Sequence, residues 1–198
     1  MSRSIGQTVE ILLRRVRQEG GLAVDVNLAT EIYSRCEQII NVALSCVLVN
    51  ATLNTPKQKL LFSLRTEFPA AASIVSFTQS NRTIPQSKTL DEFSAYSPDW
   101  FRSIDGTRFE SWHPIGRDLF ILFPGQAAAS SLTITYVKLL TLHTSFAASY
   151  NTASELPDEN IEAALILAEI ILLCRFRLLS AIPKRLEQAA SLLKTKGI

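Results

Sequence analysis

Apolar residues in the first 45 positions recur every three or four residues, which is the spacing of a helix. Residues 4–19 carry one such stripe, and Gly20 with Gly21 follows it. Ser4 and Gln7 have the spacing of a capping box, in which two side chains bond to the free N–H groups of the first turn. We therefore predict a helix over 4–19 that ends at the two glycines. Its apolar stripe consists of Ile5, Val9, Leu12, Leu13 and Val16.

A second helix is predicted over residues 28–43, with Asn27 as its cap. One side of this helix is apolar, and we expect that side to point inward. The predicted inner face consists of Leu28, Ile32, Cys36, Ile39, Ile40 and Ala43.

Between residues 46 and 140 the period changes to two, which is typical of strands with one buried face. Residues 46–54 alternate in this way, 55–58 have turn composition, and 59–64 are predicted to run back as the partner strand. Further strands are predicted over 73–79, 82–86, 109–114, 118–123 and 131–140. A short helical insertion is predicted near 89–102, because Thr89 and Glu92 repeat the capping-box spacing and Ser97 precedes Pro98.

Residues 141–153 are small and polar, and they are predicted to form a linker. The segment 154–159 then opens a long apolar helix: Pro157 suits a first helical turn, and Asp158 and Glu159 place negative charge at the positive end of the helix dipole. We predict that this helix runs to about Leu179 and that Pro183 breaks or kinks it. A last helix is predicted over 184–194, with Leu186, Ala190 and Leu193 on one side.

These elements predict an α+β fold. Residues 1–45 and 154–198 are expected to form an α-helical bundle, with two N-terminal helices and one or two C-terminal helices. Residues 46–140 are expected to form a central antiparallel domain that resembles a β-sandwich.

The composition is that of a folded protein with unusually little charge. Hydrophobic residues make up 47% of the chain and charged residues 19%. Either surface hidden against other subunits or a large core accounts for this balance. The net charge of +2 argues against wholesale binding to nucleic acid, which needs a concentrated basic face.

Two apolar segments have part of the character of a targeting or membrane sequence. The apolar stretch 5–16 is interrupted by Glu10, Arg14 and Arg15, so it does not read as a signal peptide. The stretch 161–174 is too short and, with Glu162 and Glu169, too polar to span a bilayer, so no membrane is expected. The three cysteines lie in apolar stretches without CxxC spacing, which favours buried, reduced thiols and synthesis in the cytoplasm.

The sequence offers few candidates for catalysis. His113 and His143 have no neighbours at metal-ligand spacing, so no metal, cofactor or catalytic residue is expected. Glu162 and Glu169 lie seven residues apart and therefore on one face of the long helix. Paired carboxylates can perform acid–base chemistry, but nothing basic or nucleophilic lies beside them in sequence. A solvated stripe or a salt bridge between subunits is the preferred interpretation.

Two further patterns concern binding. Aromatic residues alternate with arginines in the strand region, as in proteins that stack single-stranded bases, although a sandwich core is the preferred interpretation. The chain from Arg175 onward carries six basic residues against the single acid Glu187. This end is either a solvated helix face or a contact with an acidic partner. The aromatic and basic residues of the first pattern are Trp100, Phe101, Phe109, Trp112, Phe120, Phe123, Arg102, Arg108 and Arg117.

The order of motifs along the chain resembles that of a known family. After two N-terminal helices comes a threonine-rich strand at 51–55 and its return at 60–64. Leu90-Asp91-Glu92 and Pro98-Asp99-Trp100 follow, then a proline-terminated apolar strand at 119–124 and the Leu-Thr-Ile-Thr-Tyr strand at 132–136. The Leu-Pro-Asp-Glu helix start at 156–159 comes last. In this order the chain resembles the head-to-tail adaptor (connector) proteins of tailed bacteriophages.

The resemblance implies a structural virion protein without catalysis. About twelve copies would form a homo-oligomeric ring through heterologous contacts, with helices packed between neighbours. The ring would lie at the head–tail interface, bind the portal protein on one side and a tail or nozzle protein on the other, and extend the DNA channel. DNA would pass through without sequence-specific contact. The protein would be synthesised in the host cytoplasm.

The residues expected at a portal or intersubunit interface are the charged residues of the C-terminal helices. Three alternatives remain: a tail-side ring protein (a nozzle or terminator), a single-stranded nucleic-acid-binding module, and an enzyme that uses His113 or the two glutamates. The candidate interface residues are Arg175, Arg177, Lys184, Arg185, Lys194, Lys196, Glu162 and Glu169.

Overall fold

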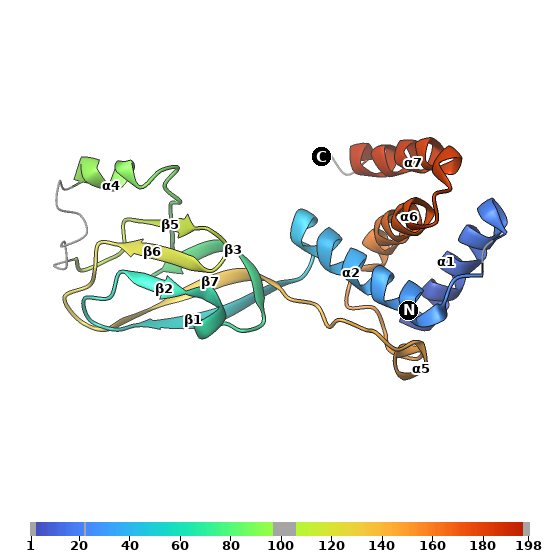
Figure 1. Cartoon of the computed structure of the whole chain (residues 1–198). Coiled ribbons are helices and arrows are strands. Elements are labelled where there is room, and N and C mark those ends of the chain that lie inside the picture. Colours follow the sequence, from blue (N-terminus) through green and yellow to red (C-terminus); the bar gives the residue numbers. More distant parts are fainter. Residues whose placement is uncertain (1–2, 22, 97–105, 196–198) are drawn as a thin grey trace. The chain divides into compact units, whose positions relative to one another are not determined.

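The fold is α+β, as the sequence predicts, with helices toward both ends of the chain and strands in the middle (Figure 1). The computed structural model describes residues 3–21, 23–96 and 106–195. The chain divides into two compact units. Met1–Val47 and Leu140–Ile198 form the helical unit, and Leu48–Leu139 form the β unit.

The helical unit is built around one central helix, α6. Figure 1 shows α7 along one side of α6 and α1 and α2 along the other. Among the helices that the structure describes, none has both the length and the apolar character needed to cross a membrane. The elements are α1 (Ile5–Gly20), α2 (Val26–Leu44), α5 (Phe146–Ser149), α6 (Asp158–Arg175), the 3₁₀ helix η2 (Leu179–Ala181) and α7 (Ile182–Thr195).

Helix α6 is apolar on nearly every side, and other helices of the same chain cover it. Ile161, Leu165 and Leu172 are each at most 1% exposed, and they pack in one cluster with residues of α1 and α2. A helix that is hydrophobic all round belongs in a core. Helices α1, α2 and α7 of the same chain provide this cover, which corresponds to the large core that the composition allowed.

The start of α1 is confirmed. Gln7 N donates to Ser4 Oγ at 3.2 Å, and Ser4 N donates to Gln7 Oε1 at 3.3 Å, which completes the capping box. Gly21, with φ +65°, ends the helix in the left-handed conformation that glycine adopts without strain.

Helix α2 differs from the prediction at its cap and on its inner face. Asp25 is the cap, since its Oδ1 accepts from Leu28 N at 2.9 Å, while Asn27 Oδ1 accepts from Phe146 N. Ile39 is 50% exposed and Ala43 is also exposed. Ile39 and Ala43 are exposed because mainly polar residues occupy the inner face of α2 from Tyr33 onward. There the buried residues are Tyr33, Ser34, Cys36, Glu37 and Asn41.

The boundary between the last two helices also differs. Helix α6 ends at Arg175 rather than near Leu179, because Arg177 adopts φ +60° and Leu178 N donates to Leu173 O at 2.9 Å. Pro183 breaks nothing. It lies in the first turn of α7, where a missing N–H costs little.

Two of the apolar residues that were predicted to share one side of the last helix are exposed. Leu186 is 54% exposed, and Ala190 is exposed as well. Arg185, Ala189 and Leu192 are the better-covered positions of α7. The side chain of Leu193 lies outside the described residues.

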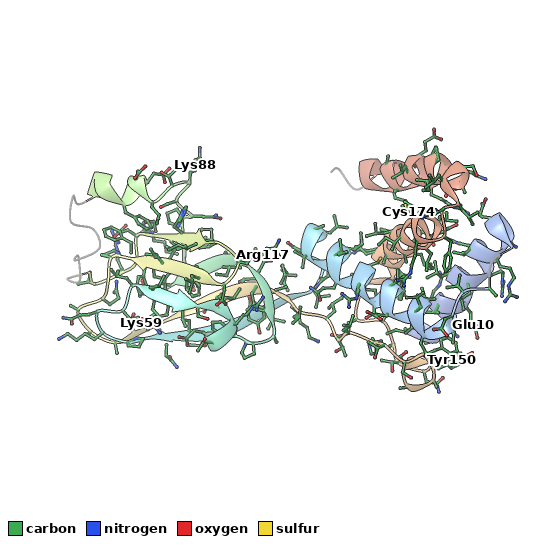
Figure 2. The ribbon with its side chains drawn as sticks, in the orientation of Figure 1. Glu10, Lys59, Lys88, Arg117, Tyr150 and Cys174 are labelled. Carbon is green, nitrogen blue, oxygen red and sulfur yellow. The ribbon has the colours of Figure 1, made fainter. Side chains whose placement is uncertain are left out.

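Residues 141–153 are part of the helical unit rather than a linker. They contain α5 and then run against the start of α1, where Ile5 N donates to Thr152 O at 2.9 Å. A side chain at position 6 would meet Tyr150 Cα at 2.8 Å, so Gly6 permits this close approach. Tyr150 Oη donates to Glu10 Oε1 at 3.2 Å, and both residues are labelled in Figure 2.

The β unit is a sandwich of two antiparallel sheets whose inner faces form one aromatic-rich cluster. The strand order is β1-β7-β3-β4 in one sheet and β2-β6-β5 in the other. The strands are β1 (Leu48–Thr55), β2 (Leu61–Ser63), β3 (Ala71–Gln79), β4 (Arg82–Ile84), β5 (Ser111–Ile115), β6 (Leu119–Phe123) and β7 (Ser130–Lys138), with the short helices α3 (Leu64–Glu67) and α4 (Asp91–Tyr96).

The predicted pairing of the first two strands is wrong. Strand β1 pairs with β7 along eight residues, and β2 pairs with β6 in the opposite sheet. The chain crosses from one sheet to the other between β1 and β2, and in the second sheet Phe62 stacks on its register partner Phe120, with ring centroids 5.4 Å apart. The hairpin of β3 and β4 through Ser80 and Asn81 is confirmed, and both turn residues have positive φ.

The predicted helical insertion contains α4. Glu92 Oε2 accepts from Lys88 N at 3.0 Å, so the return bond of the predicted capping box reaches one residue further back than Thr89. The predicted turn at 97–100 lies outside the described residues.

Candidate functional site

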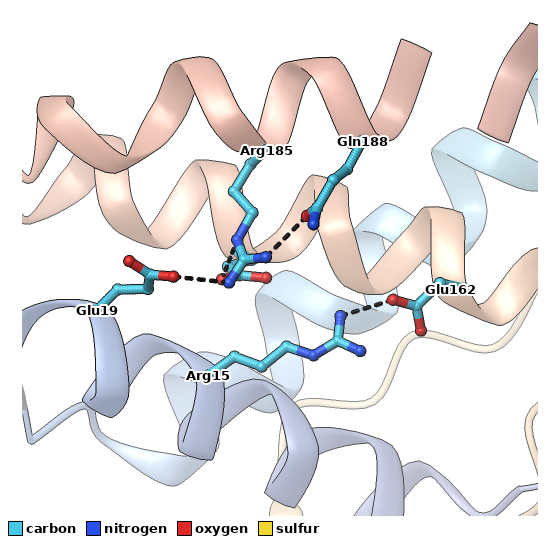
Figure 3. Close-up of polar contacts among 6 residues, drawn as sticks. Arg15, Glu19, Glu162, Arg185 and Gln188 are labelled. Carbon is cyan, nitrogen blue, oxygen red and sulfur yellow. Dashed lines mark hydrogen bonds and ion pairs between the residues drawn. The ribbon is translucent and has the colours of Figure 1, made fainter. Parts of the chain in front are cut away.

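Several charged residues of the helical unit lie at an open groove between α1, α6 and α7. The groove has a volume of about 490 Å³. Two arginines and a glutamate line it together with uncharged polar and apolar side chains (Figure 3). The lining residues are Arg15, Gln18, Glu162, Ile166, Arg185, Gln188, Ser191 and Leu192.

Arg185 reaches from α7 toward both other helices. Its Nη2 donates to Glu19 Oε1 at 3.0 Å and its Nη1 donates to Gln188 Oε1 at 2.7 Å. Its Nε lies 2.7 Å from Glu169 Oε1 without the alignment of a hydrogen bond, so this contact is an ion pair. Only 13% of the Arg185 side chain is exposed. The guanidinium is thus occupied by groups of its own chain.

Glu169 is the buried end of this network. Its side chain is fully buried on α6, and neither carboxylate oxygen has an aligned hydrogen-bond donor among the described residues. Burial raises the pKa of the Glu169 carboxyl, and the nearby charges of Arg185 and Arg15 partly oppose that effect. A carboxylate in this position requires the arginine, because an unpaired buried charge is strongly destabilising.

Glu162 has its own basic partner. Arg15 Nη1 on α1 donates to Glu162 Oε1 at 2.7 Å, and both side chains are partly exposed. The ion pairs expected between subunits are thus formed within the chain, by arginines that are distant in sequence. Each glutamate pairs with an arginine of another helix of the same unit. The arrangement joins α1, α6 and α7, and it supplies no free base or nucleophile.

Three of the candidate cations lie apart from this network. Arg175, Arg177 and Lys184 are exposed, and none of them forms an ion pair with any residue that the structure describes. Lys194 belongs to α7, but its side chain lies outside the described residues, as does the whole of Lys196. The structure thus separates Arg185, which is used internally, from the cations that face solvent.

A second buried carboxylate, Glu37 on α2, was not recognised from the sequence. It is 3% exposed and accepts hydrogen bonds at Oε1 from Tyr33 Oη, at 3.0 Å, and from Ser154 Oγ. Burial raises the pKa of the Glu37 carboxyl, although these two hydrogen bonds oppose the shift. Ser154 Oγ also accepts from Leu156 N at 3.1 Å, so Glu37 holds the segment that leads into α6.

The burial of Glu169 and Glu37 could be predicted only in part from the sequence. Glu169 stands out as an acid within an otherwise apolar stretch of helix, which demands a partner. That partner is on α7, and helix periodicity alone does not identify it. The burial of Glu37 could not be inferred, because the apolar face predicted for α2 included Ile39 and did not include Glu37.

The two histidines lie in different units. His113 Nδ1 lies 2.9 Å from Ser87 O, and the backbone N–H of His143 donates to Ser34 Oγ at 2.9 Å. No group of three or more potential metal ligands occurs among the described residues. Burial raises the pKa of the Cys36 thiol to about 12, which keeps it protonated. Cys174, labelled in Figure 2, is exposed rather than buried as expected.

The aromatic residues of the strand region form the sandwich core. Phe109, Trp112, Phe120 and Phe123 are each at most 3% exposed. Phe77 contacts Trp112 edge-on, with ring centroids 5.1 Å apart. Arg108 Nε donates to Glu110 Oε1 at 2.9 Å. These rings are therefore not placed to stack bases. Trp100, Phe101 and Arg102 lie outside the described residues.

No protein-family model matches the chain, and no curated protein matches its sequence.

Proposed function

We propose that the chain is a head-to-tail adaptor of a tailed bacteriophage, which forms a ring of about twelve copies between the portal and the tail. The observation that carries the proposal is the order of motifs over nearly the whole chain, from the strand at 51–55 to the helix start at 156–159. The α+β fold, with its helices in one unit and its strands in the other, is compatible with that order.

The exposed surface of the C-terminal helices supports a contact with another chain. Leu179 and Leu186 are 62% and 54% exposed, and Lys184 lies between them in sequence without an ion pair to any described residue. Exposed leucines beside unpaired cations suit a partner surface that is apolar and acidic. We assign this surface to the portal contact. The groove charges that pair inside the helical unit, including Arg185, Glu162 and Glu169, are not part of it.

The alternatives have less support. A single-stranded nucleic-acid-binding module would need exposed aromatic rings, and the described rings of the strand region lie in the core. An enzyme would need a free base or nucleophile, whereas the two glutamates of α6 pair with arginines. A tail-side ring would share the ring geometry of the proposal but would not bind the portal.

Binding to the portal protein tests the assignment. The chain and the portal protein of its phage should copurify, and the double variant Arg175→Glu/Lys184→Glu should weaken that binding at least about tenfold by reversing two charges. Arg117→Glu is the matched control: it reverses one exposed cation in the β unit, labelled in Figure 2. Equal losses in both variants, or no binding by the wild type, would refute the portal contact.

A further inference from the structure

Strand β1 forms one edge of the four-stranded sheet and carries none of the features that normally protect an edge. Proteins blunt exposed edges with short strands, charged residues, proline or bulges. Strand β1 has eight residues, Leu48–Thr55, and pairs with β7 in unbroken register. Its sequence, Leu-Val-Asn-Ala-Thr-Leu-Asn-Thr, contains no charge, no proline and no glycine.

The other three sheet edges are protected. Strand β4 has three residues and begins with the exposed Arg82, and β2 also has only three residues. Strand β5 contains Pro114, which has no N–H to offer to a further strand. Part of β5 is also covered, because Trp112 N donates to Pro85 O at 3.0 Å. Protection at three edges makes its absence along β1 notable.

The outer edge of β1 has unused hydrogen-bonding groups. In an antiparallel pair, alternate residues of an edge strand direct their N–H and C=O groups away from the partner. Within the part of the chain that the structure describes, no backbone or side-chain group outside β7 bonds to the backbone of β1. These groups form a continuous template for one more extended strand.

The side chains of β1 leave the edge incomplete on both faces. On the face toward the sandwich, Val49 and Ala51 pack against the core but are only half-buried. On the opposite face, Leu48 is 49% exposed, and Asn50 and Thr52 are exposed as well. A strand laid beside β1 would extend the sheet and cover the open flank of Val49 and Ala51.

From this geometry we infer that β1 pairs antiparallel with β1 of a second copy of the chain, joining two β units in a continuous eight-stranded sheet. The sheet of each copy contributes its strands β1, β7, β3 and β4. The contact is isologous, since the same strand is used by both copies about a two-fold axis.

The occupant is a second copy because β1 is compatible with itself and with no other edge of the chain. Self-pairing places each residue near its own counterpart, so a charged strand would oppose its own charge, and β1 has none. The other edges are too short or contain proline. Matching the two faces requires Ala51 or Thr52 to lie opposite its own copy. In either register, the residues at the centre of the outer face are polar and meet polar residues of the second copy. Those at the centre of the inner face are aliphatic and meet aliphatic residues.

This pairing is separate from the proposed ring. Contacts within a closed cyclic ring are heterologous, so a two-fold contact joins copies of two different rings or forms a dimer before assembly. The contact therefore stands or falls independently of the portal assignment.

Substitution of Thr52 tests the pairing. In analytical ultracentrifugation over a dilution series, the wild type should show a two-fold association. Thr52→Lys should raise the dissociation constant of that association at least about tenfold, because two lysines then meet near the axis. Thr52→Glu should do the same. A mixture of the two variants should recover association as a heterodimer, seen by native mass spectrometry, because the charges are now opposite.

Thr133→Lys is the matched control. Thr133 lies directly across from Thr52 on β7, is exposed on the same face, and has its backbone paired with both β1 and β3. This variant should associate like the wild type. A wild type without two-fold association, an unchanged Thr52→Lys, an equal loss in Thr133→Lys, or a mixture that stays apart would each overturn the inference. Because a closed ring does not use the two-fold contact, Thr52→Lys should still form rings, so failure of this pairing and failure of the adaptor proposal are distinguishable.

Discussion

At the scale of single residues, the helical unit depends on one buried ion pair. Glu169 is fully buried on α6, and Arg185 on α7 is its counter-ion as well as a donor to Glu19. Removing one member of a buried ion pair leaves the other charge without a counter-ion and strongly lowers the free energy of unfolding. Replacing both members by apolar residues has a much smaller effect. The sequence indicated both residues as charged positions of one surface. Only the packing of α7 on α6 shows that they neutralise each other.

Arg185→Met should therefore lower the free energy of unfolding by about 3 kcal/mol or more. Lys184→Met, one position earlier and exposed, should change it by less than about 0.5 kcal/mol. Urea denaturation followed by circular dichroism measures both. Similar small effects in the two variants would mean that Glu169 does not rely on Arg185.

Glu37 makes stability depend on pH. Its pKa is raised in the folded chain, chiefly by burial, and Glu155 raises it further. The folded chain thus holds this proton more tightly than the unfolded chain does. The stability that the group contributes is fully present below the unfolded glutamate pKa of about 4.3, and it is lost as the pH rises through the folded value.

Glu37→Gln removes this titration and keeps an oxygen that accepts from Tyr33 and Ser154. The free energy of unfolding of Glu37→Gln, measured relative to wild type, should increase as the pH is raised from 4 to 8, a range chosen to bracket the titration of a carboxyl group with a pKa above about 4.3. Glu31→Gln, on the solvent side of the same helix in an ion pair with Arg35, serves as control. If the difference between Glu37→Gln and wild type is flat with pH, Glu37 is not buried as a titrating carboxyl.

At the scale of elements, the sequence predicted where helices and strands lie better than where they end and what they face. Ser4 and Gln7 identified the start of α1 because a capping box is local chemistry. The outward turn of Ile39 and Leu186 was not predictable, because it depends on which face another helix covers. The pairing of β2 with β6 was missed for the same reason: it joins segments that are distant in sequence, such as those of Phe62 and Phe120.

The end of α6 gives a test at this scale. Arg177 adopts φ +60°, a conformation that costs most residues about 1 kcal/mol and glycine almost nothing. Arg177→Gly should raise the free energy of unfolding by up to about 1 kcal/mol, whereas Arg175→Gly, in the last helical turn, should lower it by about 1 kcal/mol. Thermal unfolding of the two variants measures the contrast. Destabilisation of both would show that α6 does not end at Arg175.

At the scale of the whole molecule, the chain has two units with separate cores, and the segments around residues 47 and 139 connect them. The α+β class follows from a change of period that is visible in the sequence. The assignment of residues 141–153 to the helical unit is not visible there, because it rests on the close approach of Tyr150 to Gly6. The proposed function belongs to this scale, since an adaptor acts only as an assembly.

The central claim is that copies of this chain form a closed ring that binds a portal. The most direct measurement is native mass spectrometry of the purified chain, alone and with the portal protein of the proposed phage. The proposed function predicts rings of about twelve protomers of 21.9 kDa, single or paired through β1, and a larger complex when the portal is present. A chain that remains a monomer under both conditions would contradict it.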